Sequence, residues 1–187
     1  IRFYPYGFAN FVSVSLKDLA KTETPIEMLF GEEVAKKLEQ DIIQATDTKQ
    51  RIEIIEYFLQ NKLKEQVMVS NIVTNIVRET IDTLLATKGS ASINDILEGN
   101  LSKRRQLERM FVKQVGISPK QLGKLIRLQS ALKMLLNQED ESLTNIAYNN
   151  EYYDQAHFTK DFKEFTGVSP KEFLGNDNMA LSSAFYK

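Results

Sequence analysis

The sequence of 187 residues contains no cysteine and only one histidine. The lack of cysteine excludes disulfides, thiolate metal sites and cysteine nucleophiles, and it fits a reducing compartment. A single histidine argues against a metal cluster built from histidines and against a Ser-His-Asp arrangement. No apolar run approaches the roughly 18 residues of a membrane span, and the start is not typical of a signal peptide. We therefore expect no catalytic residue, metal, cofactor or membrane partner, and a cytoplasmic location.

Glycine and proline are also scarce, and both are absent from residues 32 to 88. That gap predicts helices joined by short links. The first helix begins near residue 31, and a third, within 71–89, ends at a glycine. The second begins after Asp47, a cap residue followed three positions later by Gln50. The apolar stripe of this second helix consists of Ile52, Ile55, Leu59 and Leu63.

The opening residues 1–16 differ from this pattern. They hold Pro5, Gly7 and several aromatic residues, which predicts the end of a strand-rich region followed by a turn. Because the chain starts at Ile1 rather than methionine, we interpret it as a fragment of a longer protein. Its hydrophobic content of 42% and charged content of 26% are typical of one or two compact globular domains.

The formal net charge of −1 is unevenly distributed. Residues 1–89 sum to −2, whereas residues 102–127 sum to +7 because Glu108 is their only acidic residue. The basic residues of this island are Lys103, Arg104, Arg105, Arg109, Lys113, Lys120, Lys124 and Arg127. Such a density indicates a polyanionic partner, although a solvated helix face is the simpler alternative for a charge run taken alone.

One seven-residue phrase occurs twice: "GISPKQL" at 116–122 and "GVSPKEF" at 167–173. Each copy is a helix end followed directly by a helix start, since glycine can adopt the left-handed conformation that ends a helix. The serine can cap the next helix, and proline suits its first position, where a missing N–H is harmless. Alone, this turn has weak specificity.

The same offset of 51 residues extends backwards from the phrase. It aligns Leu107 with Phe158 and Phe111 with Phe162. Each copy therefore consists of a two-turn helix, a short turn and a longer helix, which is the plan of a helix-turn-helix motif. A helix over 119–136 joins the two copies.

A helical wheel at about 100° per residue assigns the faces of the two longer helices. The inward residues are Leu107, Met110 and Phe111 in the first copy, and Phe158, Phe162 and Phe165 in the second. The outward residues are Arg105, Glu108, Arg109 and Val112 in the first copy, and Ala156, Thr159, Lys160 and Lys163 in the second. Arginine, threonine and lysine are residue types that reach base edges and phosphates. A joining helix of 18 residues is about 27 Å long, which allows a separation of about 34 Å, one turn of B-DNA, between the two longer helices.

Residues 73–174 resemble the DNA-binding domain of the AraC family of bacterial transcription regulators. The second motif carries the most specific part of the match. Its matching residues are Ala147, Tyr153, Asp154, Gln155, Phe158, Lys160, Phe162, Lys163, Gly167, Ser169 and Pro170. The usual arginine before the Phe-Lys pair is replaced by Lys160 and Asp161. By this resemblance, base and backbone contacts fall to Arg105, Glu108 and Arg109 in the first copy and to Gln155, Thr159 and Lys160 in the second. The whole expected DNA-binding set is Lys103, Arg104, Arg105, Glu108, Arg109, Lys113, Gln155, His157, Thr159, Lys160 and Lys163.

We accordingly expect a mainly α protein with two helix-turn-helix subdomains joined by a long linker helix. A helical N-terminal segment with a little β structure, residues 1–70, is expected to be a truncated sensor or oligomerisation region. The DNA-binding domain is expected over 71–174, with motifs at about 92–116 and 142–167, followed by a tail over 175–187.

Double-stranded DNA is the expected partner of the domain. The other expected partners are RNA polymerase, a second copy bound through the N-terminal region, and a small-molecule effector in the full-length protein only. Because residues 151–171 sum to −1, the first motif should dominate DNA affinity.

Several residues and functions remain open. His157 has equal claims as a DNA contact and as a residue filling the turn, and Asp154 is expected to cap a helix rather than to read a base. The alternative function is a helical protein–protein adaptor with residues 31–88 as an oligomerisation platform. An enzyme is disfavoured because no triad, metal cluster or phosphate loop is recognisable.

Overall fold

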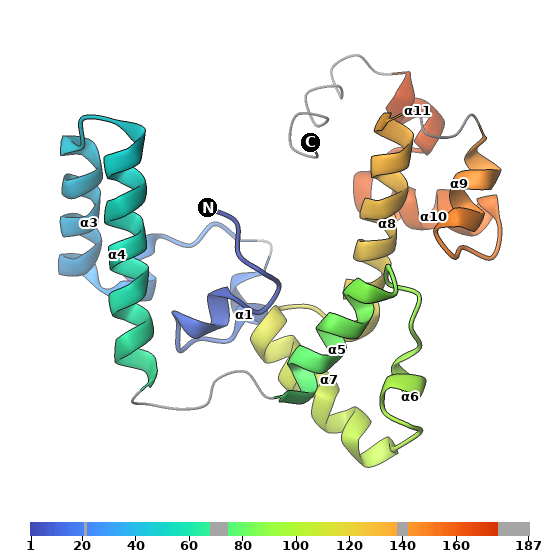
Figure 1. Ribbon diagram of the computed structural model, residues 1–187, viewed down its shortest axis with the longest axis horizontal. Coiled ribbons are helices and arrows are strands. Elements are labelled where there is room, and N and C mark those ends of the chain that lie inside the picture. Colours follow the sequence, from blue (N-terminus) through green and yellow to red (C-terminus); the bar gives the residue numbers. More distant parts are fainter. Residues whose placement is uncertain (21, 68–74, 138–141, 176–187) are drawn as a thin grey trace. The chain divides into compact units, whose positions relative to one another are not determined.

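The computed structural model describes residues 1–20, 22–67, 75–137 and 142–175. All regular structure in these ranges is helical, which confirms the mainly α prediction (Figure 1). The chain forms two compact units. The first contains residues 1–81 and 101–118, and the second contains residues 82–100 and 119–187. The expected tail lies outside the described residues except for Gly175.

The first unit contains a helical hairpin and a smaller N-terminal group. Its elements are the 3-10 turn Phe8–Asn10, α1 (Leu16–Leu19), α2 (Ile26–Phe30), α3 (Glu32–Gln44), α4 (Thr48–Val67), the start of α5 (Asn75–Ala86) and α7 (Leu101–Val115). Helices α3 and α4 lie side by side, and α2 packs on α3 (Figure 1). Helix α1 packs against α7.

The strand ending expected over residues 1–16 is wrong. The described part of this segment forms a 3-10 turn, and the amide of Gly7 donates to the carbonyl of Tyr4 at 2.6 Å. The aromatic residues pack on one another instead of along a ladder, with the ring of Phe3 5.1 Å from Phe8 and 5.5 Å from Phe11. A local aromatic cluster thus takes the place of cross-strand pairing.

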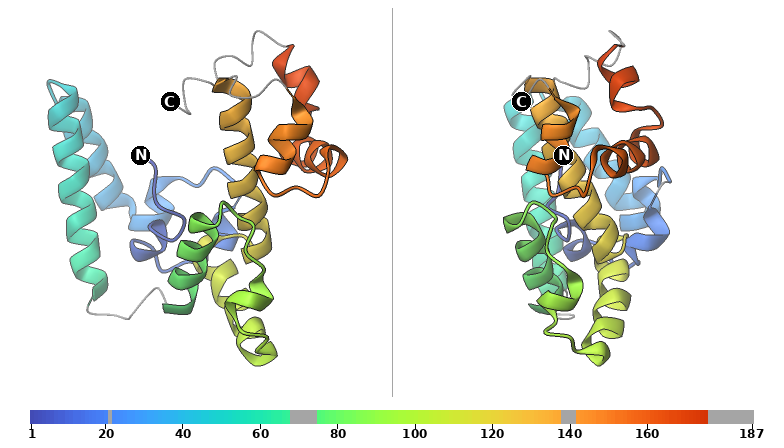
Figure 2. Two further views of the ribbon diagram at one scale, coloured as in Figure 1. Left: turned by 45° about the vertical axis from the view of Figure 1, so that its right-hand side comes forward. Right: turned by 90° about the vertical axis from the view of Figure 1, so that its right-hand side faces the viewer.

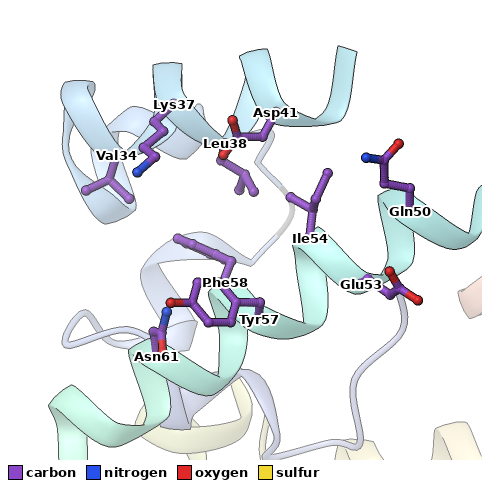
Figure 3. Close-up of a pocket in the computed structure, with 10 residues that line it drawn as sticks. All are labelled: Val34, Lys37, Leu38, Asp41, Gln50, Glu53, Ile54, Tyr57, Phe58 and Asn61. Carbon is purple, nitrogen blue, oxygen red and sulfur yellow. The ribbon is translucent and has the colours of Figure 1, made fainter. Parts of the chain in front are cut away.

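The start of α4 follows the predicted cap. The Gln50 amide donates to Asp47 Oδ1 at 2.8 Å, while Gln50 Oε1 accepts from the Thr46 amide at 2.7 Å. The reciprocal bond therefore reaches one residue further back than in a standard capping box. Ile54 and Phe58 of α4 face α3 across a groove between the two helices (Figure 3).

The second unit is built around α8 (Pro119–Asn137). Its other helices are the end of α5, α6 (Ile93–Ile96), α9 (Leu143–Asn149), α10 (Gln155–Thr166) and α11 (Pro170–Leu174). Helices α9 and α10 pack on α8 and on each other (Figure 2). The core of this unit comprises Leu128, Ala131, Leu132, Leu135, Ile146, Ala147, Tyr152, Phe158, Phe162 and Phe173.

Gly89 ends the third predicted helix as expected. It has φ of +82°, and its amide donates to the carbonyl of Leu84 at 2.7 Å. A Cβ at this position would collide with the carbonyl of Gly123 in α8. The lack of a side chain therefore serves both the turn and the close approach of two backbones.

Candidate nucleic-acid interface

The longer helix of the first motif is α7, and its inner face is built as predicted. Leu107 and Phe111 are fully buried, and Met110 is partly buried. The helix ends at Gly116, where φ is +89°. A Cβ on Gly116 would lie 3.0 Å from the carbonyl oxygen of Leu16, so this glycine also admits the packing of α1.

The outer face of α7 is basic. All of its predicted contact residues are exposed: Lys103, Arg104, Arg105, Glu108, Arg109 and Lys113. Arg104 Nε pairs with Glu108 Oε1 at 3.2 Å, one helical turn away. Arg105, Arg109 and Lys113 make no ion pair with other described residues, which leaves three cations for an external anion. Val112, predicted to face outward, is only partly exposed.

The second motif consists of α9 and α10, and each helix begins at a side-chain cap. Ser142 accepts from the Thr144 amide at 3.2 Å, and Asp154 Oδ1 accepts from the His157 amide at 2.7 Å. The expectation that Asp154 caps the helix is thereby confirmed. Gly167 ends α10 in the left-handed conformation, and its amide donates to the carbonyl of Lys163.

The predicted contact residues of α10 differ in how far they are accessible. Lys160 and Lys163 are exposed, whereas Gln155, His157 and Thr159 are partly buried. The Gln155 carbonyl accepts from the Thr144 hydroxyl at 2.9 Å, so this side chain also ties α10 to α9. Fewer cations are thus accessible here than on α7.

One inward prediction for the second motif is wrong. Phe165 is 39% exposed because α11 turns back after Gly167 and its Phe173 closes the core on Phe162, with ring centroids 5.5 Å apart. The aromatic that packs before α10 is Tyr152, 5.2 Å from Phe158, whereas Tyr153 is 85% exposed. The turn before α10 therefore places the earlier tyrosine in the core.

The basic island at residues 102–127 is not a single surface. Lys124 Nζ lies 2.8 Å from Asp161 Oδ1 and 3.4 Å from Glu164 Oε2, so this cation is used inside the second unit. The hydrogen bond with Asp161 raises the pKa of Lys124. Asp161, which is included in the charge sum of −1 over residues 151–171, is 1% exposed. The helical wheel contained this signal, since Asp161 falls within about 60° of Phe158 on the inner face.

Arg127 is the second basic residue of the island that is used inside the second unit. Its Nη1 donates to the carbonyl of Glu151 at 3.1 Å, and its guanidinium lies 5.0 Å from the ring centre of Tyr152. Burial raises the pKa of Tyr152 to about 12. Both cations therefore connect α8 with the second motif.

Two other kinds of site are absent from the described ranges. No helix there is long and apolar enough to cross a bilayer. Nor do three or more histidine or acidic side chains come together, in the same ranges, in a way that could hold a metal ion.

Comparison with known proteins agrees with a helix-turn-helix protein. A family model described as a helix-turn-helix domain matches residues 101–176. An uncharacterised HTH-type transcriptional regulator of Haemophilus influenzae is 27% identical over 80% of this chain and 51% of its own length. The HTH-type transcriptional regulator MtrA of Neisseria gonorrhoeae is 36% identical over 42% of this chain and 25% of its own. GbdR of Pseudomonas aeruginosa, also an HTH-type transcriptional regulator, is 35% identical over 37% of this chain and 18% of its own.

The chain spans about half the length of the first of these relatives and less of the others. No solved structure matches it. The matched domain contains α7 and the whole second motif. The matching domain and these relatives confirm the resemblance of residues 101–176 to the helix-turn-helix domain of AraC-family regulators.

Proposed function

We propose that this chain is the DNA-binding part of a transcriptional regulator that reads two successive major-groove segments with α7 and α10. One observation carries the proposal. Two helices at equivalent places of a repeated motif each bury an aromatic face and expose a polar face with cations. A helix-turn-helix protein inserts such a face into the major groove.

On α7, the side chains suited to base edges are Arg105, Glu108 and Arg109. Arginine can donate two hydrogen bonds to guanine, and glutamate can accept one from cytosine. Lys103, Arg104 and Lys113 lie on the same exposed helix and suit the phosphates on either side. We assign to this helix the larger share of the affinity.

On α10, the corresponding residues are Gln155, Thr159 and Lys160, with His157 and Lys163 placed for phosphates. Glutamine can pair with adenine, and threonine adapts to several bases. Since the two helices carry different residues, the target should be asymmetric.

Helix α8 is a continuous spacer of 19 residues. Its length of about 28 Å suits the proposed reading of two major-groove segments one turn of B-DNA apart, which is about 34 Å. The domain limits proposed above, 71–174, include both motifs and this spacer.

The test is a fluorescence anisotropy titration against promoter fragments at several salt concentrations. Binding should depend on sequence and weaken steeply with salt, because each phosphate contact releases counterions. Arg109→Ala should cost about 1–3 kcal/mol on the preferred sequence if Arg109 pairs with guanine. The control is Lys64→Ala, which removes an exposed cation of α4 and should leave binding unchanged.

The results of this titration distinguish a base contact from a phosphate contact, and DNA binding from the adaptor function. A loss that is equal on all sequences would make Arg109 a phosphate contact. Absence of binding at low salt, or binding without sequence preference, would contradict the proposal. A tight protein complex that survives high salt would instead favour the adaptor function.

A second proposal concerns self-association through α4, which carries two apolar faces. One face, with Ile54 and Phe58, meets α3 across an open groove of about 500 Å³ (Figure 3). The stripe of Ile52, Ile55, Leu59 and Leu63 lies on the opposite side, at spacings close to a coiled-coil seam. Ile52 is 50% and Leu63 is 42% exposed.

We propose a second copy of this chain as the partner of that stripe. Charges of both signs flank it, including Arg51 and Glu56, which suits pairing with an identical helix. By the family resemblance, RNA polymerase is the further partner proposed for the DNA-bound regulator, and an effector is proposed for the full-length protein only. A nucleoid-associated, cytoplasmic location is proposed on the same ground.

A further inference from the structure

A partly buried charge pair in the second unit joins the spacer helix to the second recognition helix. Lys124 on α8 and Asp161 on α10 are 37 residues apart in sequence, and their side chains meet at 2.8 Å. We propose that this pair is a latch that sets the rotation of α10 and thereby positions its DNA-contacting face. The inference rests on the proposed DNA binding, which it deepens by assigning positioning residues.

Because the carboxylate of Asp161 is buried, it requires a cationic partner. Asp161 is 1% exposed, and the Lys124 side chain is 24% exposed. A buried carboxylate without a cation is strongly unfavourable, whereas an exposed pair would contribute little. The second oxygen of Asp161 makes no hydrogen bond with described residues and lies 3.7 Å from His157 Nε2. The carboxylate thus depends on Lys124 for its main partner.

Because Asp161 lies on α10, the pair can control the direction in which the recognition face of this helix points. Phe158 and Phe162 lie beside it on the inner side and are fully buried. Thr159 and Lys160 precede it and project from the same helix toward the outer side. A packed apolar face tolerates small rotations, because dispersion contacts are not directional. A hydrogen-bonded charge pair of defined length does not tolerate such rotations. It can therefore specify one rotation of the helix about its axis.

A second contact holds the turn before α10. Arg127 lies one turn after Lys124 on α8 and therefore on the same face. It donates to the carbonyl of Glu151 and covers the ring of Tyr152. One face of the spacer thus contacts both parts of this region: Arg127 holds the turn before α10, and Lys124 holds α10 itself.

This arrangement separates two kinds of cation in one basic stretch. Those of α7 are exposed and suited to phosphates, whereas Lys124 and Arg127 are committed to the fold. A phosphate contact contributes to the salt dependence of binding, and its loss lowers the slope of log K against log salt by about one. A positioning residue should change affinity and footprint without changing that slope.

The experiment uses the whole chain and three variants. Lys124→Met removes the cation, Lys124→Arg keeps it, and the double variant Lys124→Met with Asp161→Leu replaces the pair by apolar groups that keep the core filled. The double variant keeps the test valid if Lys124→Met alone fails to fold. Lys133→Met is the control, because Lys133 is an exposed cation of the same helix.

Each variant is measured by anisotropy across salt concentrations and by hydroxyl-radical footprinting on the preferred sequence. In the double variant we expect at least tenfold weaker specific binding, unchanged nonspecific binding, an unchanged salt slope, and loss of protection in the α10 segment only. Lys124→Arg should restore the wild-type footprint. A slope reduced by about one with an intact footprint would make Lys124 a phosphate contact and overturn the latch.

Amide hydrogen exchange on the free proteins tests the latch without DNA. Exchange in α10 should rise in Lys124→Met or in the double variant, and stay at the wild-type level in Lys133→Met. Wild-type exchange and a wild-type footprint in the double variant would overturn the latch. If the wild-type protein itself gives no sequence-dependent footprint, the proposed function fails, and the exchange result still decides whether the pair orders α10.

Discussion

Glu151 occupies a backbone conformation that glycine favours, with φ of +58° in the turn between α9 and α10. Its side chain is exposed, and its carbonyl accepts the hydrogen bond from Arg127. A non-glycine residue here bears a steric cost, because Cβ crowds the carbonyl in the left-handed region. The turn is therefore held in place partly by the contacts around it.

We predict that Glu151→Gly stabilises the protein by about 0.5–1 kcal/mol, since relief of a cost of about 1–2 kcal/mol exceeds the added freedom of the unfolded chain. Urea unfolding followed by circular dichroism measures the change. The matched control is Lys133→Gly, placed in α8 at an ordinary helical φ, which should destabilise by about 1 kcal/mol. Equal destabilisation by both substitutions would show that no strain is stored at Glu151.

The positions of some single residues could be predicted from the sequence, and those of others could not. The cap at Asp154 was predictable because it acts over three residues of the same chain segment. The exposure of Phe165 was not, because it depends on where α11 places Phe173. A helical wheel assigns directions around an axis, but it does not say where along that axis the core ends.

Among the helices, α11 shows how a five-residue element is kept together. Ser169 and Glu172 form a capping box, in which the Ser169 amide donates to Glu172 Oε2 at 2.7 Å and the Glu172 amide donates to the serine hydroxyl at 3.3 Å. The hydrogen bond that the Ser169 amide donates to the carboxylate lowers the pKa of Glu172 below its usual value. The buried Phe173 ties the helix to the core.

The pH dependence of this element follows from that lowered pKa. A carboxyl group with a lowered pKa in the folded protein stabilises it above the pKa of the unfolded chain. This contribution is lost as pH falls from about 4.5 through the folded-state pKa. We therefore expect the stability difference between wild type and Glu172→Gln, which keeps an acceptor but does not titrate, to be constant near neutral pH and to shrink below about pH 4.5. Urea unfolding from pH 7 to pH 3 measures it, and a difference independent of pH would contradict the role of the ionised carboxylate.

At the scale of the whole molecule, the open stripe on α4 predicts self-association. Ile52→Glu and Leu63→Glu should each shift the protein toward monomer, because a charge would then have to be buried in an apolar seam. Sedimentation velocity over a range of concentrations measures the effect. Lys64→Glu, on an exposed position away from the stripe, should leave the association unchanged.

If the wild-type chain is monomeric at every concentration, the stripe does not mediate dimers and the second proposal is wrong. Equal weakening by Lys64→Glu would point to net charge instead of apolar contact. Neither outcome affects the DNA-binding proposal, which concerns α7 and α10.

The amino-acid sequence by itself determined the helices, their caps and the repeated plan of two motifs. Those features depend on interactions within a few residues: Asp47 with Gln50, Ser169 with Glu172, and a left-handed glycine at position 89 or 167. Only the tertiary structure decided that Lys124 and Arg127 are taken up by the second motif, that Asp161 is buried, and that one apolar stripe of α4 stays open. Burial and charge pairing between distant residues depend on which helices pack together, and local periodicity does not contain that information.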